Sequence, residues 1–482
     1  MSTGSNCARV PCPRYRPAGR RYHRADDGVN RWSFGSIAPL TIHTLVHIGI
    51  NMRKIIAFDI MRLFIGPSFL TPRGIDRVDL ALASHIFGNK SSNNIGVLPT
   101  PFGVYAYTAE QVRILLSYIR ELWAEDTKPA GDLQLQWLLD KIALRHDALL
   151  SPIPPATGLL LRNKVWRMLR MLHATGLFPR RFAHRTVPAN AVYLNIGQLG
   201  LAMPSFFNWL AKRPDITCAM MIHDAIPIDY PHLVGEKAPA YHRQMIRTAA
   251  QHADCMIFNS AYTRDSVSAV MRDLGQACPP ALVRSLPLPA AFIDVETGME
   301  ELSGTHYFVA VSTIEPRKNF ALLLRVWQRF VATMGAAAPH LIIVGSPGKD
   351  AGSILAPLES DTVLANRVHH VVGLSSPALA SLVLGAAGVL CPTLAEGFGL
   401  PLLEANAMGV PAIATDIPAH RELATATTVL LPPDDEEGWV RAIAASPKVA
   451  MRRRPHIPFA MTEAAYCADV VEFVSGIQGR AI

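Results

Sequence analysis

The stretch GVLCPTLAEGFGLPLLEANAMGVPAIAT, residues 388–415, predicts a strand, a helix and a second strand in succession. Its apolar runs at 388–393 and 410–415 are typical of buried strands. Pro401 suits the first turn of the helix between them, where its missing N–H costs nothing. A strand that leads through a helix into another strand is the unit of a parallel sheet covered by helices on both faces. The stretch therefore indicates the α/β class.

The same alternation runs through most of the chain. Prolines and acidic residues interrupt it at 285–304, which marks a domain boundary. We expect two doubly wound, Rossmann-like domains at 52–300 and 301–454, facing across a cleft beyond the carboxyl ends of their strands. The other strand-like runs are 55–60, 192–197, 217–224 and 255–260 in the first domain, and 306–312, 340–345, 368–373 and 428–433 in the second.

The N-terminal segment 1–51 shows no helical or strand periodicity and carries seven arginines against two aspartates. We interpret it as a disordered tail or a misassigned N-terminus, with translation starting at Met52, because an apolar strand follows that methionine closely. A short tail rich in arginine and proline lacks the folded basic face that nucleic-acid binding requires. No nucleic-acid partner is therefore expected.

The hydropathy, charge and cysteine content of the chain indicate where in the cell the protein is expected. A mean hydropathy of +0.20 with 17% charged residues is typical of a folded chain close to a membrane. The seven cysteines include no Cys-x-x-Cys pair, so neither a disulfide framework nor a metal site is indicated. We expect a cytoplasmic protein, peripheral on the inner face of the cytoplasmic membrane, without a metal or other cofactor.

The segment 159–185 holds seven lysines and arginines and no acidic residue, with apolar residues at helical spacing. One interpretation is an interfacial helix that binds an anionic membrane surface. The alternative is an ordinary surface helix with a solvated basic face. The hydropathy of the chain favours the membrane.

Glu396 and Glu404 are the only charged residues in 388–415. Gly397 and Gly399 let backbone amides approach a ligand at the start of the helix, a site suited to hydroxyl or phosphate oxygens. Glu404 lies about one turn into that helix, where a carboxylate can accept two vicinal hydroxyls, as on a ribose. The alternative is that both glutamates cap the helix start. Two carboxylates in so apolar a run make this alternative the weaker one.

Charged residues also follow two other strands. Arg317 and Lys318, in STIEPRKNF (312–320), come after the first strand of the second domain, where adjacent cations can neutralise a diphosphate without metal. His223 and Asp224 end the run at 217–224, so they face the crevice or are buried at a cost. The alternatives are a solvated surface turn for the first pair, and a packed histidine with a capping aspartate for the second.

The segments VAVSTIEPRKNF, LIIVG, VHHVVGLSSPAL and AEGFGLPLLEANAMGVPAIATDIPAHREL resemble the nucleotide-sugar domain of retaining GT-B glycosyltransferases of family four. HDAIPIDYP and FNSAYTRDSV resemble stretches of that family's first domain. The similarity covers most of 52–450 and is weak from about 88 to 190, the part that usually differs with the acceptor. It implies the GT-B fold and a C-terminal helix at 455–482 that returns to the first domain.

The resemblance implies roles for particular residues. Arg317 and Lys318 would hold the donor diphosphate, Glu404 the ribose, and His223 the sugar near its reacting carbon. Glu396 would hold the donor sugar together with the amides that follow it. TPRGIDRV (71–78) matches the loop that approaches the phosphates, but Arg73 stands where the family often has a glycine, so Arg73 would add a phosphate or acceptor contact. The other expected donor-site residues are Gly74, Ser312, Gly397, Phe398, Gly399 and Leu400, and the other cleft residues are Asp224, Asn259 and Ser260.

The function that follows is a metal-independent, retaining transfer of a sugar from a sugar nucleotide to a glycan or polyprenyl-diphosphate-linked oligosaccharide. Mannose from a guanine nucleotide is favoured, because HDAIPIDYP and GIDRVDLA look most like bacterial mannosyltransferases of exopolysaccharide or O-antigen assembly. Two alternatives are a sugar-nucleotide epimerase on the same fold and a catalytically silent scaffold. A nicotinamide-dependent dehydrogenase is disfavoured because no G-x-G-x-x-G turn follows the first strand.

Overall fold

The computed structural model describes residues 54–65, 74–126, 133–143, 166, 169–173, 186–447 and 461–477. The N-terminal segment 1–51, Met52 and Arg73 lie outside these residues, as does most of the basic segment 159–185. The chain divides into two units, 1–52 and 53–482, and the description below concerns the second.

The first sheet has seven strands in the order β3-β2-β1-β4-β5-β6-β7, parallel throughout except for the antiparallel pair β2 and β3. Its strands are buried on both faces, since Ile56 and Phe58 of β1 pack into one apolar cluster and Ala57 packs into another. The strands are β1 (Ile56–Asp59), β2 (Ile95–Thr100), β3 (Gly103–Thr108), β4 (Val192–Asn195), β5 (Thr217–Met221), β6 (Cys255–Phe258) and β7 (Ala281–Val283).

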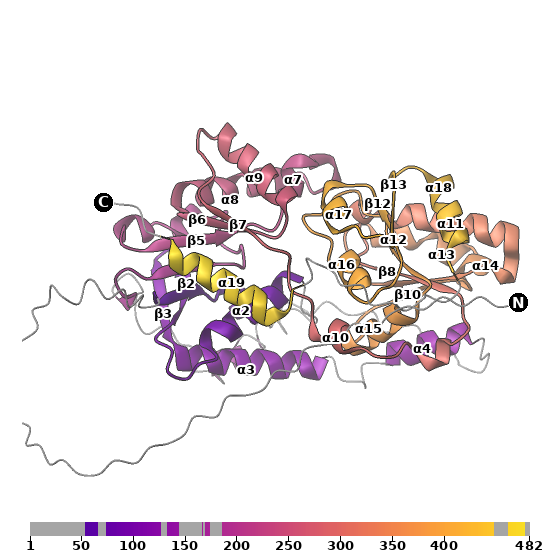
Figure 1. Ribbon diagram of the computed structural model, residues 1–482, viewed down its shortest axis with the longest axis horizontal. Helices are drawn as coiled ribbons and strands as arrows, with labels where there is room; N and C mark the ends of the chain where they lie inside the picture. Colours follow the sequence, from indigo (N-terminus) through magenta and orange to yellow (C-terminus); the bar gives the residue numbers. More distant parts are fainter. Residues whose placement is uncertain are drawn as a thin grey trace, which may run out of the picture. The chain divides into compact units, whose positions relative to one another are not determined.

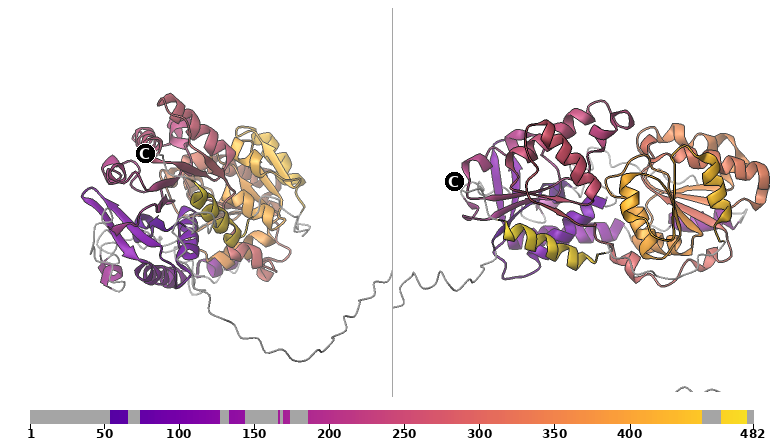
Figure 2. Two further views of the ribbon diagram at one scale, coloured as in Figure 1. Left: turned by 60° about the vertical axis from the view of Figure 1, so that its left-hand side comes forward. Right: turned by 45° about the horizontal axis from the view of Figure 1, so that its top comes forward.

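Helices lie on both faces of this sheet (Figures 1 and 2). One face is covered by α2 (Gly74–Phe87), α3 (Ala109–Asp126) and α19 (Glu463–Gly476), and the other by α8 (Ala238–His252) and α9 (Ala261–Asp273). Short helices α1 (Met61–Ile65) and α7 (Ile226–Asp229) follow β1 and β5. Although α19 is the last described helix of the chain, it packs against α2 through Tyr466, Cys467 and Val470.

The second sheet has six strands, all parallel, in the order β10-β9-β8-β11-β12-β13. Its strands are β8 (Tyr307–Val311), β9 (His340–Val344), β10 (Val368–Val371), β11 (Gly388–Cys391), β12 (Ala412–Thr415) and β13 (Thr428–Leu431). One face carries α11 (Phe320–Met334), α14 (Thr362–Ala365) and α18 (Glu436–Ala445), and the other α15 (Ser376–Gly385) and α16 (Leu400–Ala407). Two doubly wound α/β sheets confirm the fold class that the sequence predicts.

The second sheet also receives a helix from far upstream. Helix α4 (Leu133–Ile142) precedes β4 of the first sheet in the sequence but packs against β10, the edge strand of the second. Its Leu138 is fully buried in the same apolar cluster as Val371. The cover of the second sheet is therefore completed by residues from the first half of the chain.

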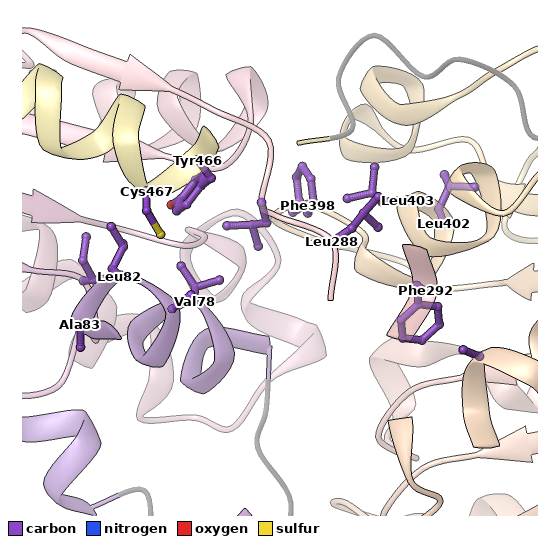
Figure 3. Close-up of a cluster of buried hydrophobic side chains, with 14 of the residues drawn as sticks. Val78, Leu82, Ala83, Leu288, Phe292, Phe398, Leu402, Leu403, Tyr466 and Cys467 are labelled. Atoms are coloured by element: carbon purple, nitrogen blue, oxygen red, sulfur yellow. The ribbon is translucent and has the colours of Figure 1, made fainter. Parts of the chain in front are cut away.

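The segment that connects β7 to β8 forms backbone contacts with the C-terminal segment that begins at Met461. After β7, Pro287 forms a β-bridge with Met461, and the amide of Leu288 donates to the carbonyl of Met461 at 3.1 Å. Helix α10 (Ala290–Asp294) then inserts Phe292 into the apolar cluster. Figure 3 shows this cluster passing from Val78 on α2 through Leu288 to the leucines of α16. Among the helices that the structure describes, each is too short or too polar for a membrane crossing.

Candidate active site

The site is built on the carboxyl ends of β8 and β11, which are neighbours in the second sheet with Phe308 opposite Gly388. After β8 the chain passes Ser312 into the short 3-10 helix η8 (Pro316–Lys318), and Asn319, with φ of 53°, turns it into α11. After β11 the loop 392–399 leads to α16, where Pro401 occupies the first turn as the sequence predicts. The two loops therefore meet over one edge of the sheet.

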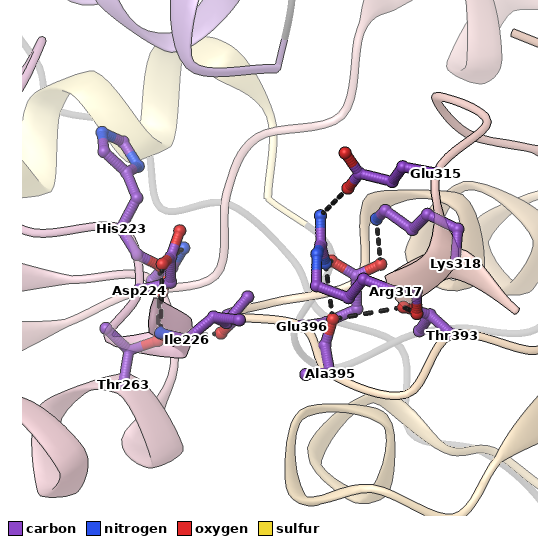
Figure 4. Close-up of polar contacts among 12 residues, drawn as sticks. His223, Asp224, Ile226, Thr263, Glu315, Arg317, Lys318, Thr393, Ala395 and Glu396 are labelled. Carbon is purple, nitrogen blue, oxygen red and sulfur yellow. Dashed lines mark hydrogen bonds and ion pairs between the residues drawn. The ribbon is translucent and has the colours of Figure 1, made fainter. Parts of the chain in front are cut away.

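Arg317, Lys318 and Glu396 form a compact charged cluster at this edge (Figure 4). The guanidinium of Arg317 donates to the carbonyl of Ala395 at 2.6 Å and to Glu315 at 2.7 Å, and lies 3.4 Å from Glu396. The ammonium group of Lys318 donates to the other carboxylate oxygen of Glu396. The structure thus brings together the cation pair and the carboxylate that the sequence selected separately.

The charges of this cluster are coupled. Burial opposes the ionisation of Glu396, but Lys318 and Arg317 outweigh burial and lower the pKa of the carboxyl to about 2. Burial likewise works against the charge of Arg317, yet Glu396 and Glu315 raise the pKa of the guanidinium above its ordinary value. At neutral pH Glu396 and Arg317 are therefore both charged, and protein carboxylates partly neutralise the cations of the cluster.

Glu404 lies in a different environment, one turn into α16. Its side chain is 7% exposed, and the described residues offer it no hydrogen bond. Burial raises the pKa of Glu404 to about 7, against a lowering by Arg77 of α2. A buried carboxyl without protein donors is suited to accept hydrogen bonds from the hydroxyls of a ligand.

His223 follows β5 of the first sheet and is 4% exposed. Its Nε2 lies 2.9 Å from the carbonyl oxygen of Ile196, so Nε2 carries the proton and Nδ1 holds a lone pair. Burial lowers the pKa of His223 to about 4, which keeps the ring neutral at pH 7. Nδ1 is buried and finds no partner among the described residues. The ring can accept a hydrogen bond but cannot offer a positive charge.

The loops after β5, β6 and β11 interlock around Gly397. A Cβ atom on Gly397 would lie 2.3 Å from the carbonyl oxygen of His223 and 2.7 Å from Cβ of Asp224. The hydroxyls of Ser260 and Thr263 donate to the carbonyl of Gly397 at 2.6 and 2.9 Å. The side-chain amide of Asn259 donates to the carbonyl of His223 at 2.9 Å. Ser260 and Asn259 thus hold backbone within the site, and their predicted acceptor role stays a prediction.

The remaining predicted donor residues lie around the same loop. A hollow of about 20 Å³ beside the charged cluster is lined by Ser312 and Gly399 together with Lys318 and Glu396. Gly74, at the start of α2, lies so close to Leu400 that a Cβ would stand 2.7 Å from the leucine Cδ1. A larger cavity of about 250 Å³ adjoins this contact, between α2, the segment 287–290 and Leu400.

Three polar residues of the site escaped the sequence analysis. His420 of α17 (Pro418–Leu423) lines the small hollow, and its ring would lie 3.1 Å from a Cβ on Gly399. Glu422 accepts from the amides of Ala261 and Tyr262, which open α9 of the first sheet, at 2.9 and 2.6 Å. Arg77 reaches Ser376 of α15 at 3.2 Å. In the sequence, the histidine and the glutamate stand in an ordinary amphipathic turn, which gives no signal of these contacts.

Within the described residues, no three histidine, cysteine, aspartate or glutamate side chains are grouped so that they could hold a metal ion. The polar groups of the site are instead the cations Arg317 and Lys318, the carboxyl groups of Glu315, Glu396 and Glu404, backbone amides, and the neutral His223 of the first sheet. This set suits a ligand that carries both phosphate and hydroxyl groups.

Residues 305–446, which contain this cluster, match the family model described as "Glycosyl transferases group 1". This part of the chain is therefore a group 1 glycosyltransferase domain. Over 217 residues, 42% of the chain and 26% of the relative, the chain is 26% identical to the serotype-specific mannosyltransferase WbdA of Escherichia coli. Over 227 residues it is 26% identical to the O-antigen chain mannosyltransferase RfbU of Salmonella typhimurium, covering 46% of the chain and 58% of RfbU. The chain thus spans less than two thirds of the length of each of these relatives.

Solved structures give a further comparison. Trehalose-6-phosphate synthase OtsA aligns with a TM-score of 0.49 and 10% identity, over 80% of this chain and 89% of OtsA. Sucrose-phosphate synthase from Thermosynechococcus elongatus aligns with a TM-score of 0.44 and 16% identity, over 66% of this chain and 76% of that protein.

Proposed function

We propose that the protein is a retaining glycosyltransferase that moves mannose from a nucleotide diphosphate sugar to a glycan. One observation carries the proposal: Arg317 and Lys318 both contact the carboxylate of Glu396 at the carboxyl ends of two neighbouring strands. Two cations that can bind a diphosphate therefore lie next to a carboxylate and backbone amides that can bind a sugar. The mannosyltransferase names of WbdA and RfbU support mannose as the transferred sugar.

In the proposed reaction the acceptor hydroxyl attacks the anomeric carbon from the face on which the diphosphate leaves. The bond between the acceptor oxygen and that carbon forms, the bond from that carbon to the phosphate oxygen breaks, and the acceptor proton passes to an oxygen of the departing diphosphate. Arg317 and Lys318 stabilise the growing negative charge, and the loop amides position the sugar. In this reaction every bond that breaks and the transferred proton are accounted for without a metal, a cofactor or a covalent enzyme intermediate.

Two further groups orient the donor. Glu404 accepts hydrogen bonds from the ribose hydroxyls, for which its buried and unpartnered carboxyl is suited. Nδ1 of His223 accepts a hydrogen bond from a sugar hydroxyl, because its lone pair is the free position of the neutral ring. Arg73, although outside the described residues, would add a contact to the phosphates or the acceptor.

The proposed acceptor is a lipid-linked oligosaccharide of polysaccharide assembly, met at the inner face of the cytoplasmic membrane. The basic composition of 159–185 supports an approach to an anionic surface. The O-antigen relatives support an acceptor in cell-surface polysaccharide synthesis.

The test is a donor screen with purified protein. We expect GDP-mannose to give the largest thermal shift and hydrolysis rate among common sugar nucleotides, including UDP-glucose, UDP-galactose and UDP-N-acetylglucosamine. Lys318→Ala should lower turnover at least 100-fold, whereas Lys349→Ala, at an exposed site in the same domain, should not change it. Absence of binding to every nucleotide would support a silent scaffold instead. Release of an epimerised sugar nucleotide would support the epimerase.

A further inference from the structure

Asp224 lies between the donor loop and the first domain. Its Cβ would stand 2.7 Å from a Cβ on Gly397, and its carboxylate interacts electrostatically with Arg317 and Glu396. Figure 4 shows Asp224 on the side of the site formed by the first sheet, facing the charged cluster of the second. A substrate group bound by Asp224 would therefore adjoin the sugar held by the donor loop.

The carboxylate of Asp224 is incompletely used by the protein. Oδ1 accepts from the amide of Ile226 at 3.2 Å, and Oδ2 has no hydrogen bond to a described residue. His242 of α8 approaches Oδ1 to 3.9 Å, which is beyond hydrogen-bond distance. The side chain of Asp224 is 29% exposed, so Oδ2 is accessible to a ligand.

His242 is oriented toward Asp224 by its own helix. Its Nδ1 lies 3.2 Å from the carbonyl oxygen of Ala238, so Nδ1 donates and Nε2 points toward the carboxylate. The 3.9 Å between Nε2 and Oδ1 leaves no direct hydrogen bond between the two side chains, and a bound polar group can bridge them. A ligand hydroxyl is such a group.

Next to this pair, Tyr241 presents an exposed aromatic ring. Its side chain is 46% exposed, and its ring centroid lies 5.9 Å from that of His242 at an interplanar angle of 60°. Tyrosine offers a rigid, partly apolar face at low cost in conformational entropy. Such a face suits the C–H surface of a pyranose ring, whose hydroxyls point outward to polar partners.

We propose that Asp224, Tyr241 and His242 form the subsite for the terminal pyranose of the acceptor glycan. Asp224 accepts the hydrogen bond of an acceptor hydroxyl through Oδ2, a second hydroxyl bonds to Nε2 of His242, and Tyr241 stacks on the ring. This inference rests on the proposed glycosyltransferase function and adds the class of acceptor group and the residues that hold it.

Binding can be measured without turnover by saturation-transfer NMR in the presence of saturating GDP. The probes are the methyl glycosides of mannose, glucose, galactose and N-acetylglucosamine. We expect at least one glycoside to bind the wild type, and Asp224→Asn and Tyr241→Ala to weaken its binding at least tenfold. Glu236→Gln, which changes an exposed acid just before α8, should bind like the wild type, and Tyr241→Phe, which keeps the ring, should bind more tightly than Tyr241→Ala.

The outcomes separate the two proposals. A wild-type protein that binds GDP but none of the glycosides overturns the subsite, as do Asp224→Asn and Tyr241→Ala variants with unchanged glycoside binding. A wild-type protein that binds neither GDP nor any sugar nucleotide overturns the proposed function, and the subsite with it. Asp224→Asn should keep its GDP dissociation constant within twofold, because the described contacts of the Asp224 carboxylate are with Ile226 and His242 and not with Arg317 or Lys318. A parallel loss of GDP affinity would show that Asp224 maintains the donor loop instead.

Discussion

Gly397, in the loop after β11 of the second sheet, lies directly against the backbone of His223, which follows β5 of the first sheet. A Cβ on Gly397 would stand 2.3 Å from the carbonyl oxygen of His223, a separation that real Cβ contacts do not show. The oxygen belongs to backbone, which Asn259 holds by a hydrogen bond of 2.9 Å, so it cannot move away as a flexible side chain would. The absence of a side chain at position 397 is therefore required for this close approach.

Gly397→Ala should consequently separate the donor loop from the loop after β5. We expect transfer activity to fall at least 100-fold, because misplacing reacting groups by about 1 Å has effects of this size. Gly352→Ala is the matched control, since nothing lies within 4 Å of a Cβ at Gly352, and it should keep full activity. The measurement is kcat/KM for transfer, and wild-type activity in Gly397→Ala would contradict the contact.

Glu396 forms ion pairs with both Lys318 and Arg317 and partly neutralises these cations. Glu396→Gln removes that charge but keeps the size of the side chain, so Lys318 and Arg317 become more available to a diphosphate. We expect GDP to bind the variant at least as tightly as the wild type, while sugar transfer falls because the sugar loses its carboxylate partner. Calorimetry with GDP and a transfer assay measure the two effects. A loss of GDP affinity would show that Glu396 orients the cations rather than competing for them.

Much of the fold could be predicted because buried parallel strands are marked by continuous apolar runs. Each of the predicted runs contains a strand, as with 306–312 and β8. Strands β2, β3 and β7 were not predicted from the sequence. Pro99 within β2 argues against a strand, but it is accommodated in the antiparallel pair with β3. β7 has only three residues and an exposed first position, which leaves no apolar run to detect.

The site was predictable in part for a related reason. In parallel sheets the ligand edge follows the strands, so His223, Arg317 and Glu396 could be selected from their positions after apolar runs. The residues that contact these side chains and loops could not be predicted, because the two members of each contact are far apart in the sequence. Ser260 and Gly397 are separated by 137 positions, and Ala261 and Glu422 by 161. Such pairs leave no periodicity, and only the packing of the loops brings them together.

Ser260 provides a test of that packing. Its hydroxyl donates to the carbonyl of Gly397 and caps the start of α9 through the amide of Thr263 at 3.0 Å. Ser260→Ala should lower kcat and reduce stability by about 1 kcal/mol, the usual value of a helix cap. The KM for the acceptor should change less than twofold, because the hydroxyl faces protein backbone. A large rise in that KM would instead place Ser260 in direct contact with the acceptor.

Glu404 makes the stability of the protein depend on pH. Its pKa is raised from the ordinary 4.5 to about 7, so the folded state holds a proton that the unfolded state has already lost between these values. The contribution of Glu404 to the free energy of unfolding is therefore fully present below pH 4.5 and is lost as the pH rises to about 7. The shift corresponds to about 3 kcal/mol, by the relation of about 1.4 kcal/mol per pKa unit. Glu404→Gln, which cannot ionise, should be more stable than the wild type at pH 7.5 and similar to it at pH 4.5.

The same substitution tests the proposed ribose contact. Above pH 7 the ionised carboxylate accepts the ribose hydroxyls more strongly than the neutral acid does, so wild-type affinity for GDP should rise from pH 6 to pH 8 relative to Glu404→Gln. Comparing the two proteins removes the contribution of the titrating phosphate, which is common to both. Denaturation midpoints and GDP dissociation constants across this range measure the two effects. Parallel pH profiles for wild type and variant would show that Glu404 neither titrates near neutrality nor contacts the nucleotide.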